Sequence, residues 1–133
     1  MHVKKTFSNK TFNFFVVFIL TIGFIMPYTA KAYKNISASD VRDLITTSSP
    51  VIIVDVRSPQ EYYSGKIPTS INIPIEIFES QIKDKSIPKT TQIVVYCQKG
   101  NRSSRAAKIL DDLGYTNVYN LGSIGNWPYD LVK

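Results

Sequence analysis

The stretch QIVVYCQKGNRSSRAAKILDDLG, residues 92–114, decides the fold class of this chain. Its first six residues are mostly apolar and β-branched, which is typical of a strand buried on both faces of a parallel sheet. Apolar residues then recur at helical spacing up to Leu113, and Gly114 stands where helices commonly end in a left-handed conformation. The stretch therefore predicts a strand over 92–97, a short loop and a helix that starts near Ser103.

The same alternation of strand and helix extends toward the N-terminus. VIIVDV (51–56) predicts a second buried strand, and RSPQEYYSG (57–65) predicts a helix with Ser58 as N-cap and Glu61 completing a capping box. Shorter elements are expected as follows: a helix in 37–45, a strand in 69–74, a helical turn or two in 75–82, a loop over 83–91 and a last strand in 117–121. Strands that alternate with helices predict an α/β fold, with a mostly parallel sheet covered on both faces.

The first 32 residues have the features of a secretory signal peptide. A basic start, MHVKKTFSNK, precedes sixteen uncharged residues (11–26), and Ala30-Lys31-Ala32 forms an AxA cleavage site. We expect cleavage after Ala32, which leaves residues 33–133 as a single domain exported to the periplasm or the cell exterior. The alternative is a retained membrane anchor, although the apolar run is shorter than the roughly 20 residues of a spanning helix.

Cleavage would also change the charge and the available chemistry. Four of the sixteen Lys and Arg residues would be removed, which leaves twelve basic and ten acidic residues. This balance does not predict the strongly basic face that nucleic-acid binding requires. His2, the only histidine, would leave too, and a single cysteine gives too few soft ligands for a metal site. We expect no nucleic-acid partner, no metal and no cofactor, and membrane contact only if the anchor is retained.

Cys97 is the only cysteine, and it lies at the carboxyl end of the predicted strand, where parallel sheets bind ligands. Only the residues from Gln98 to Arg102 separate it from the expected helix. Gly100 and Asn101 can both take positive φ, so that successive backbone N–H groups and the helix N-terminus can surround the thiol.

Such surroundings, with Lys99 or Arg102 close by, lower a cysteine pKa from about 8.5 to between about 3.5 and 7.5. Cys97 would then be a nucleophile without the help of a histidine. The alternative interpretation is a buried, inert cysteine at the end of a strand.

Two blocks of this chain, DVRSPQEYYSGKIPTSINIP (55–74) and YCQKGNRSSRAAKILDDLGYTNVYNLGSIGNW (96–127), resemble the single-domain rhodaneses, a family of sulfurtransferases. The hallmarks of that family are DVR, EYxxGHIxGAxNIP, CxxGxRS and a late GG before a tryptophan. The resemblance covers about residues 38–130. It implies a three-layer α/β/α fold around a mostly parallel five-stranded sheet.

The resemblance implies that Cys97 attacks a sulfane-sulfur donor such as thiosulfate or polysulfide, carries the sulfur as a persulfide, and passes it to a thiol or cyanide acceptor. The active-site loop would comprise six residues: Gln98, Lys99, Gly100, Asn101, Arg102 and Ser103. Arg102 would help fix this loop and supply positive charge. Lys99 favours an anionic donor, unless it is simply a solvated lysine. An exported thiol reductase that keeps Cys97 reduced is a further possible partner.

Three residues have expected supporting roles. Asp55 would order loop backbone, and Arg57 would pair with a carboxylate near the site; a direct catalytic role is the minor alternative for both. Arg105 either faces an anionic substrate or forms a solvated pair with Asp111 or Asp112.

The sequence departs from the family pattern at Lys66, at Thr69 and Ser70, and at Ser123, which replaces the second glycine of the late GG. We expect none of these residues to touch the loop around Cys97, so that they change only local packing.

Two other functions remain open. A catalytically idle binding or redox-sensing module would keep the fold and use an easily oxidised thiol. The cell-cycle phosphatases resemble this fold but have one more residue between cysteine and arginine, a loop length that favours phosphate over sulfur.

Overall fold

The structure is a computed structural model, and it describes residues 32–133. Within these residues, five strands form one sheet in the order β1-β5-β4-β2-β3, and every neighbouring pair is parallel. The strands are β1 (Lys34–Asn35), β2 (Ile52–Asp55), β3 (Ile71–Asn72), β4 (Ile93–Cys97) and β5 (Val118–Ser123). The α/β class and the parallel five-stranded sheet are therefore confirmed, whereas the predicted signal peptide falls almost entirely on residues outside those described.

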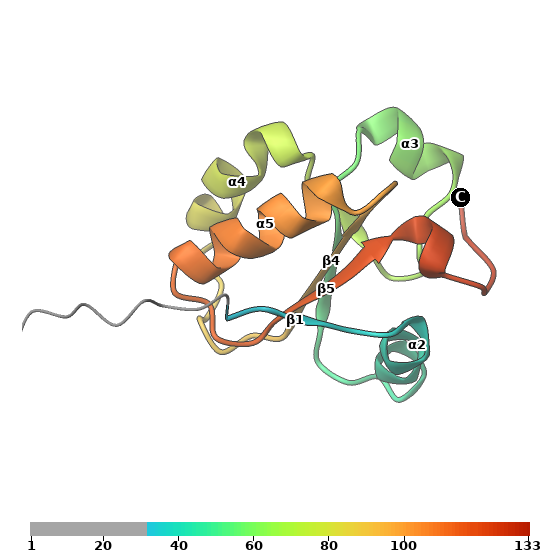
Figure 1. The fold of residues 1–133 in the computed structure, drawn as a ribbon, viewed down its shortest axis with the longest axis horizontal. Coiled ribbons are helices and arrows are strands. Elements are labelled where there is room, and N and C mark those ends of the chain that lie inside the picture. The colour runs from blue at the N-terminus through green and yellow to red at the C-terminus, as the bar shows by residue number, and fades with distance from the viewer. Residues whose placement is uncertain (1–31) are drawn as a thin grey trace, which may run out of the picture. The chain divides into compact units, whose positions relative to one another are not determined.

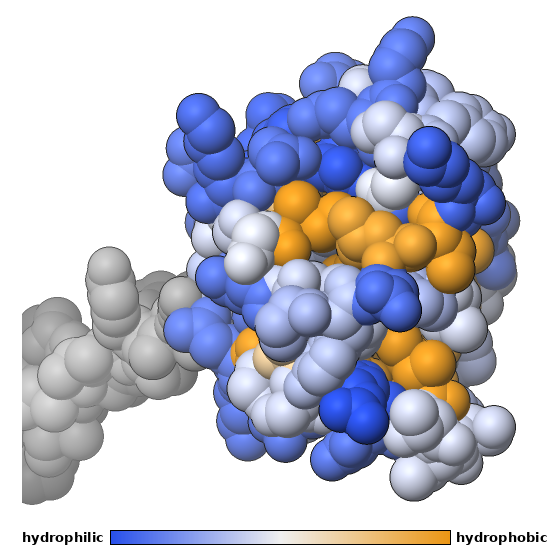
Figure 2. Space-filling model, turned by 90° about the vertical axis from the view of Figure 1, so that its right-hand side faces the viewer, coloured by the Kyte–Doolittle hydropathy of each residue, from blue (hydrophilic) through white to orange (hydrophobic). Residues whose placement is uncertain are grey.

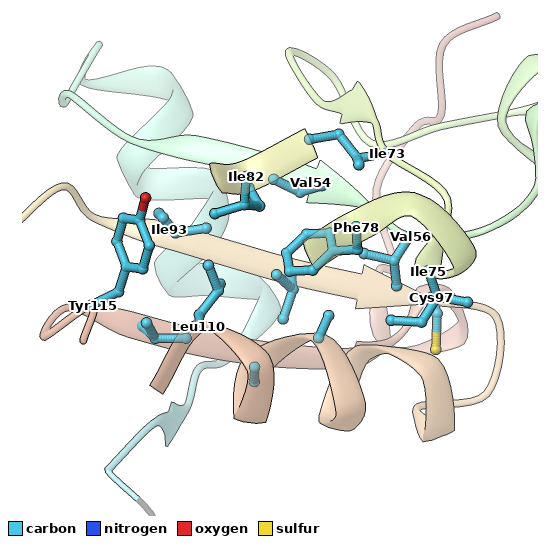
Figure 3. Packing of buried hydrophobic residues seen from close by; sticks show 14 residues of the cluster. Val54, Val56, Ile73, Ile75, Phe78, Ile82, Ile93, Cys97, Leu110 and Tyr115 are labelled. Atoms are coloured by element: carbon cyan, nitrogen blue, oxygen red, sulfur yellow. The ribbon is translucent and has the colours of Figure 1, made fainter. Parts of the chain in front are cut away.

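Helices cover both faces of this sheet, as Figure 1 shows. They are α2 (Ala38–Thr46), α3 (Pro59–Ser64), α4 (Phe78–Lys85) and α5 (Asn101–Asp112), with the short 3₁₀ turns η1 (Ile75–Ile77) and η2 (Ile124–Asn126). On one face, α4 and α5 pack Phe78, Ile82 and Leu110 onto the sheet (Figure 3). On the other face, Val41 of α2 and Trp127 belong to a second buried cluster.

Burial on both faces explains why the central strands are almost continuously apolar. All five residues of β4 are buried, with Val95 in the cluster under α4 and α5 and Val94 in the cluster under α2. Side chains of a strand alternate between faces, so each face needs its own apolar set. Cys97 ends β4 on the α5 side (Figure 3) and thereby joins the core to the loop that follows.

The structure corrects several predicted boundaries. Helix α4 runs to Lys85, three residues into the segment predicted as a loop, and is followed by Ser86 in the left-handed region with φ 50°. Helix α5 begins at Asn101 rather than near Ser103, because Gly100 already serves as its N-cap. Strand β1 is an edge of two residues with no apolar pattern of its own.

Among residues 32–133, no helix has the length and apolar character needed to cross a bilayer.

Candidate active site

The sulfur of Cys97 lies inside a turn of backbone N–H groups. The N–H of Gly100 points to Sγ at 3.0 Å, and the N–H of Ser103 does so at 3.3 Å. Gly100 has a φ of 103°, which a residue with a Cβ rarely adopts. This conformation lets the chain turn tightly enough to bring both N–H groups to the sulfur. Cys97 is only 1% exposed, so these N–H donors are its main polar environment.

Two opposing effects set the pKa of the Cys97 thiol. Burial works to raise the pKa, because it disfavours the charged thiolate. Hydrogen bonds that favour the thiolate outweigh burial, and the pKa lies below its ordinary value; they come from the Ser103 hydroxyl and from the N–H groups of Ser103, Gly100 and Lys99. The Ser103 hydroxyl donates to the Gly100 carbonyl at 3.0 Å in this structure and is also within reach of the sulfur. The arrangement suits a cysteine that acts as a nucleophile.

Arg102 points to α3, where it forms a bidentate ion pair with Glu61 at 2.8 and 3.0 Å. Glu61 also accepts a hydrogen bond from the N–H of Ser58, as the predicted capping box requires. The hydrogen bond from Arg102 lowers the pKa of Glu61 to about 2, against partial burial. Arg102 thus ties the loop to α3, and much of its positive charge is met by Glu61. Arg102 was expected to help fix the loop, but sequence reasoning missed Glu61 as its partner, although Glu61 lies in the EY block of the family pattern.

Asp55 and Arg57 form a buried ion pair at the end of β2, with 2.7 Å between Arg57 Nη2 and Asp55 Oδ2. Asp55 also accepts the backbone N–H of Arg57 at 2.9 Å. Arg57 in turn donates to the side-chain oxygen of Gln98 at 3.2 Å and to the carbonyl of Gly65 at 2.7 Å. The carboxylate partner expected for Arg57 is therefore Asp55 itself, and the pair supports the loop from one side.

The remaining predicted site residues lie at the surface. Gln98, Lys99 and Asn101 are exposed. Arg105 is also exposed, and it lines a hollow beside Glu76, Glu79 and Lys83 of η1 and α4 rather than the turn around Cys97. The acidic partners considered for Arg105 are engaged elsewhere, because Asp112 pairs with Lys108 and Asp111 accepts backbone N–H groups.

Three of the residues that depart from the family pattern, Lys66, Ser70 and Ser123, have definite contacts. Ser70 is buried and lies 3.1 Å from the Tyr96 hydroxyl, and the ammonium of Lys66 lies 4.4 Å from the centre of the Tyr62 ring. Ser123 donates a hydrogen bond of 2.6 Å to the carbonyl of Gln98. The expectation that none of these residues touches the loop is therefore wrong for Ser123. It lies 26 positions after Cys97, and only the pairing of β4 with β5 brings the two together.

A cysteine at a strand end, within a turn of inward N–H groups on a parallel α/β sheet, is the arrangement that suits the class of enzymes in which a thiol is the nucleophile. The comparisons narrow the class. The family model of the rhodanese-like domain matches residues 37–128. A putative mitochondrial thiosulfate sulfurtransferase of Schizosaccharomyces pombe is 33% identical over 117 residues, covering 75% of this chain and 81% of the relative. The chain belongs to the rhodanese family.

Other relatives agree with this assignment. Thiosulfate sulfurtransferase PspE of Escherichia coli is 35% identical over 80 residues, which are 60% of this chain and 77% of that protein. A rhodanese-related protein from Thermoplasma volcanium has a TM-score of 0.62 and 35% identity over 75% of this chain and 98% of its own. The human single-domain sulfurtransferase TSTD1 has a TM-score of 0.62 and 28% identity over 74% and 96%. The chain is accordingly a rhodanese-type sulfurtransferase.

Proposed function

We propose that this chain is an exported enzyme that moves sulfane sulfur through a persulfide on Cys97. The observation that carries the proposal is the ring of N–H donors, because it holds negative charge on sulfur both before and after loading. The depressed pKa of the thiol supports attack at neutral pH.

With thiosulfate as donor, the Cys97 thiolate attacks the outer sulfur, an S–S bond to Cys97 forms, and the S–S bond of thiosulfate breaks. Sulfite leaves with the electron pair of the broken bond. An acceptor thiolate or cyanide then attacks the outer sulfur of the persulfide and releases the Cys97 thiolate. No net oxidant or reductant is consumed, and the same N–H groups receive the charge at each stage.

The partners of Arg102 support sulfur over phosphate as the transferred group. Nη1 and Nη2 of Arg102 both donate to Glu61, so this carboxylate already neutralises much of the positive charge that a phosphate over Cys97 would need. Four residues separate Cys97 from Arg102, one fewer than in the phosphatases that resemble this fold. The exposed Lys99 in the loop supports an anionic donor such as thiosulfate.

The test is the intact mass of the mature domain after treatment with thiosulfate or polysulfide, beside Cys97→Ser. A gain of one sulfur atom in the wild type alone is expected. No gain in a protein whose thiol still alkylates rapidly would contradict the proposal and favour a binding or redox-sensing role.

Export is supported by the basic start, the uncharged run and the AxA site of residues 1–32. When the full-length sequence is expressed, the protein should be recovered outside the cytoplasm in a processed form with Tyr33 as its first residue. Recovery of the unprocessed chain in the membrane would instead support the anchor.

A thiol reductase in the same compartment is proposed as a partner, because Cys97 has no second cysteine in the chain to pair with. Recovery of the persulfide should fall in cells that lack every exported thiol reductase. Unchanged recovery would remove the partner from the scheme.

A further inference from the structure

The hydroxyl of Ser123 holds the first peptide group of the loop around Cys97. Its Oγ lies 2.6 Å from the carbonyl oxygen of Gln98, to which it donates. The same Oγ accepts the N–H of Gly125 at 3.0 Å. This second bond occupies a lone pair of the hydroxyl and leaves its proton free for Gln98, so the two bonds reinforce each other.

The position of the Gln98 carbonyl determines the direction of the next N–H. A trans peptide is planar, and its C=O and N–H point to opposite sides. When Ser123 draws the Gln98 carbonyl outward, the N–H of Lys99 must face the opposite, inward side, where it contributes to the lowered pKa of the Cys97 thiol. A side chain outside the turn thus sets the direction of one of its donors.

A local irregularity in the sheet brings Ser123 to this position. Between Val95 and Tyr96 the register of β4 against β5 shifts by one residue, and Cys97 consequently pairs with Ser123. Asn120 supports the irregularity, since its Oδ1 accepts the N–H of Gly122 at 2.9 Å. With regular pairing, Gly122 would stand beside Cys97 and offer no side chain.

The loop rests on the same two residues at a second point. A Cβ placed on Gly100 would lie 3.9–4.0 Å from the backbone of Gly122 and Ser123, so the loop lies directly over them. The Ser103 hydroxyl also lies 3.4 Å from the carbonyl of Gly122. The Gly122–Ser123 segment is therefore a platform under the loop, and the Ser123 hydroxyl is its only side-chain donor to Gln98, because glycine has none.

We propose that Ser123 is a positioning residue of this enzyme, whose hydroxyl orients the Gln98–Lys99 peptide toward the sulfur of Cys97. The family pattern has glycine here, so this chain has gained a hydrogen bond that the pattern lacks. The inference refines the proposed sulfur transfer, but it concerns the state of the thiol itself and can be measured without any sulfur donor.

The experiment compares Ser123→Ala, Ser123→Gly and Ser123→Thr with a matched control, Ser80→Ala. Ser80 is exposed on α4 and also donates its hydroxyl to a backbone carbonyl, that of Ile77, at 3.0 Å. The rate of Cys97 alkylation by iodoacetamide is measured against pH, with the thermal unfolding midpoint of each variant alongside. Loading from thiosulfate is followed separately by intact mass.

Loss of the hydroxyl should move the midpoint of the alkylation profile to higher pH and leave the plateau at high pH in place. Loading at neutral pH should slow by about three- to tenfold, as expected for one lost hydrogen bond. Ser123→Thr, which keeps a hydroxyl, should restore the wild-type profile, and Ser80→Ala should not change it. A loss of packing alone would lower the unfolding midpoint without moving the profile.

A second variant acts on the hydroxyl without removing it. A Cβ on Gly125 would lie 3.1 Å from Ser123 Oγ, so Gly125→Ala should displace this hydroxyl and shift the profile in the same direction. Unchanged profiles in Ser123→Ala and Gly125→Ala would overturn the inference. If the wild type takes up no sulfur, the proposed function fails, but the alkylation profiles still decide the role of Ser123.

Discussion

Asp55 and Arg57 are both almost wholly buried, and their charges depend on each other. A buried ion pair contributes little over an apolar pair, but removal of one partner leaves an uncompensated charge. Asp55→Asn should therefore lower the free energy of unfolding by about 3–5 kcal/mol, measured by urea denaturation.

The control for this variant is Asp112→Asn, which breaks the exposed pair with Lys108. That change should cost much less, because an ion pair in solvent contributes little to stability. Similar losses in the two variants would show that the Asp55–Arg57 pair does not stabilise the end of β2.

Glu61 gives the stability of the protein a dependence on pH. Its pKa is lowered from 4.5 to about 2 in the folded protein, chiefly by the hydrogen bond from Arg102. The unfolded state therefore binds the proton first, and the contribution of Glu61 is complete above about pH 4.5 and disappears as the pH falls toward 2. Solvent screening reduces its size, since a third of the side chain is exposed.

Glu61→Gln should flatten the fall in unfolding free energy between about pH 4.5 and about pH 2. Glu79→Gln, which alters an exposed pair with Lys83, provides the comparison. Equal slopes for wild type and Glu61→Gln over this interval would contradict the coupling of Arg102 to α3.

At the scale of the elements, the loop between β4 and α5 depends on the backbone of Gly100. Its φ of 103° is strained for any residue with a Cβ, although the nearest atoms leave room for one. Gly100→Ala should therefore cost about 1–2 kcal/mol of stability through the backbone alone. It should also slow alkylation of Cys97, because the N–H of residue 100 is a donor to the sulfur.

Gly114 supplies a matched control for this prediction. It has a φ of 89° after α5, and a Cβ there would meet no atom within 4 Å. Gly114→Ala should lose a similar amount of stability, and its Cys97 should alkylate at the wild-type rate. Equal alkylation in the two variants would show that the Gly100 conformation is not needed for the thiol.

The elements that sequence could predict are those whose pattern is local. Buried strands β2 and β4, the capping box of α3 and the apolar face of α5 all follow from neighbouring residues, and the structure confirms them. Strand β1 could not be found, because two residues at an edge carry no periodicity. The end of α4 was misplaced, since a polar segment ending in Lys85 has too few apolar residues to show its helical face.

The same limit applies to the site, where only the features that follow from neighbouring residues were predictable. The position of Cys97 at a strand end follows from the apolar run before it, and the inward N–H groups follow from the glycine in the turn. The contacts of Glu61 and Ser123 with the loop were not predictable, because each joins segments far apart in the chain. Contacts of this kind depend on how strands and helices are placed in space, and a register shift in β5 decides one of them.

In the whole molecule, several segments converge near the carboxyl ends of the strands. The C-terminus returns to the side of α3 (Figure 1), where Lys66 and Val132 exchange two backbone hydrogen bonds of 2.9 Å. Figure 2 shows that the face of the molecule on this side has apolar areas between polar ones. The exposed residues Leu131 and Val132 are in this tail, and Leu131 lies beside Gly65, whose carbonyl accepts a hydrogen bond from Arg57.

The tail should therefore stabilise the segment that follows α3. Deletion of residues 131–133 removes the two hydrogen bonds with Lys66 and should lower the free energy of unfolding by about 1–3 kcal/mol. The N–H of Lys66 should also exchange faster with deuterium, as measured by NMR. A variant with alanine at both 131 and 132 keeps the backbone bonds and should retain slow exchange. Slow exchange after the deletion would show that Gly65 and Lys66 are held by Arg57 and α3 without help from the tail.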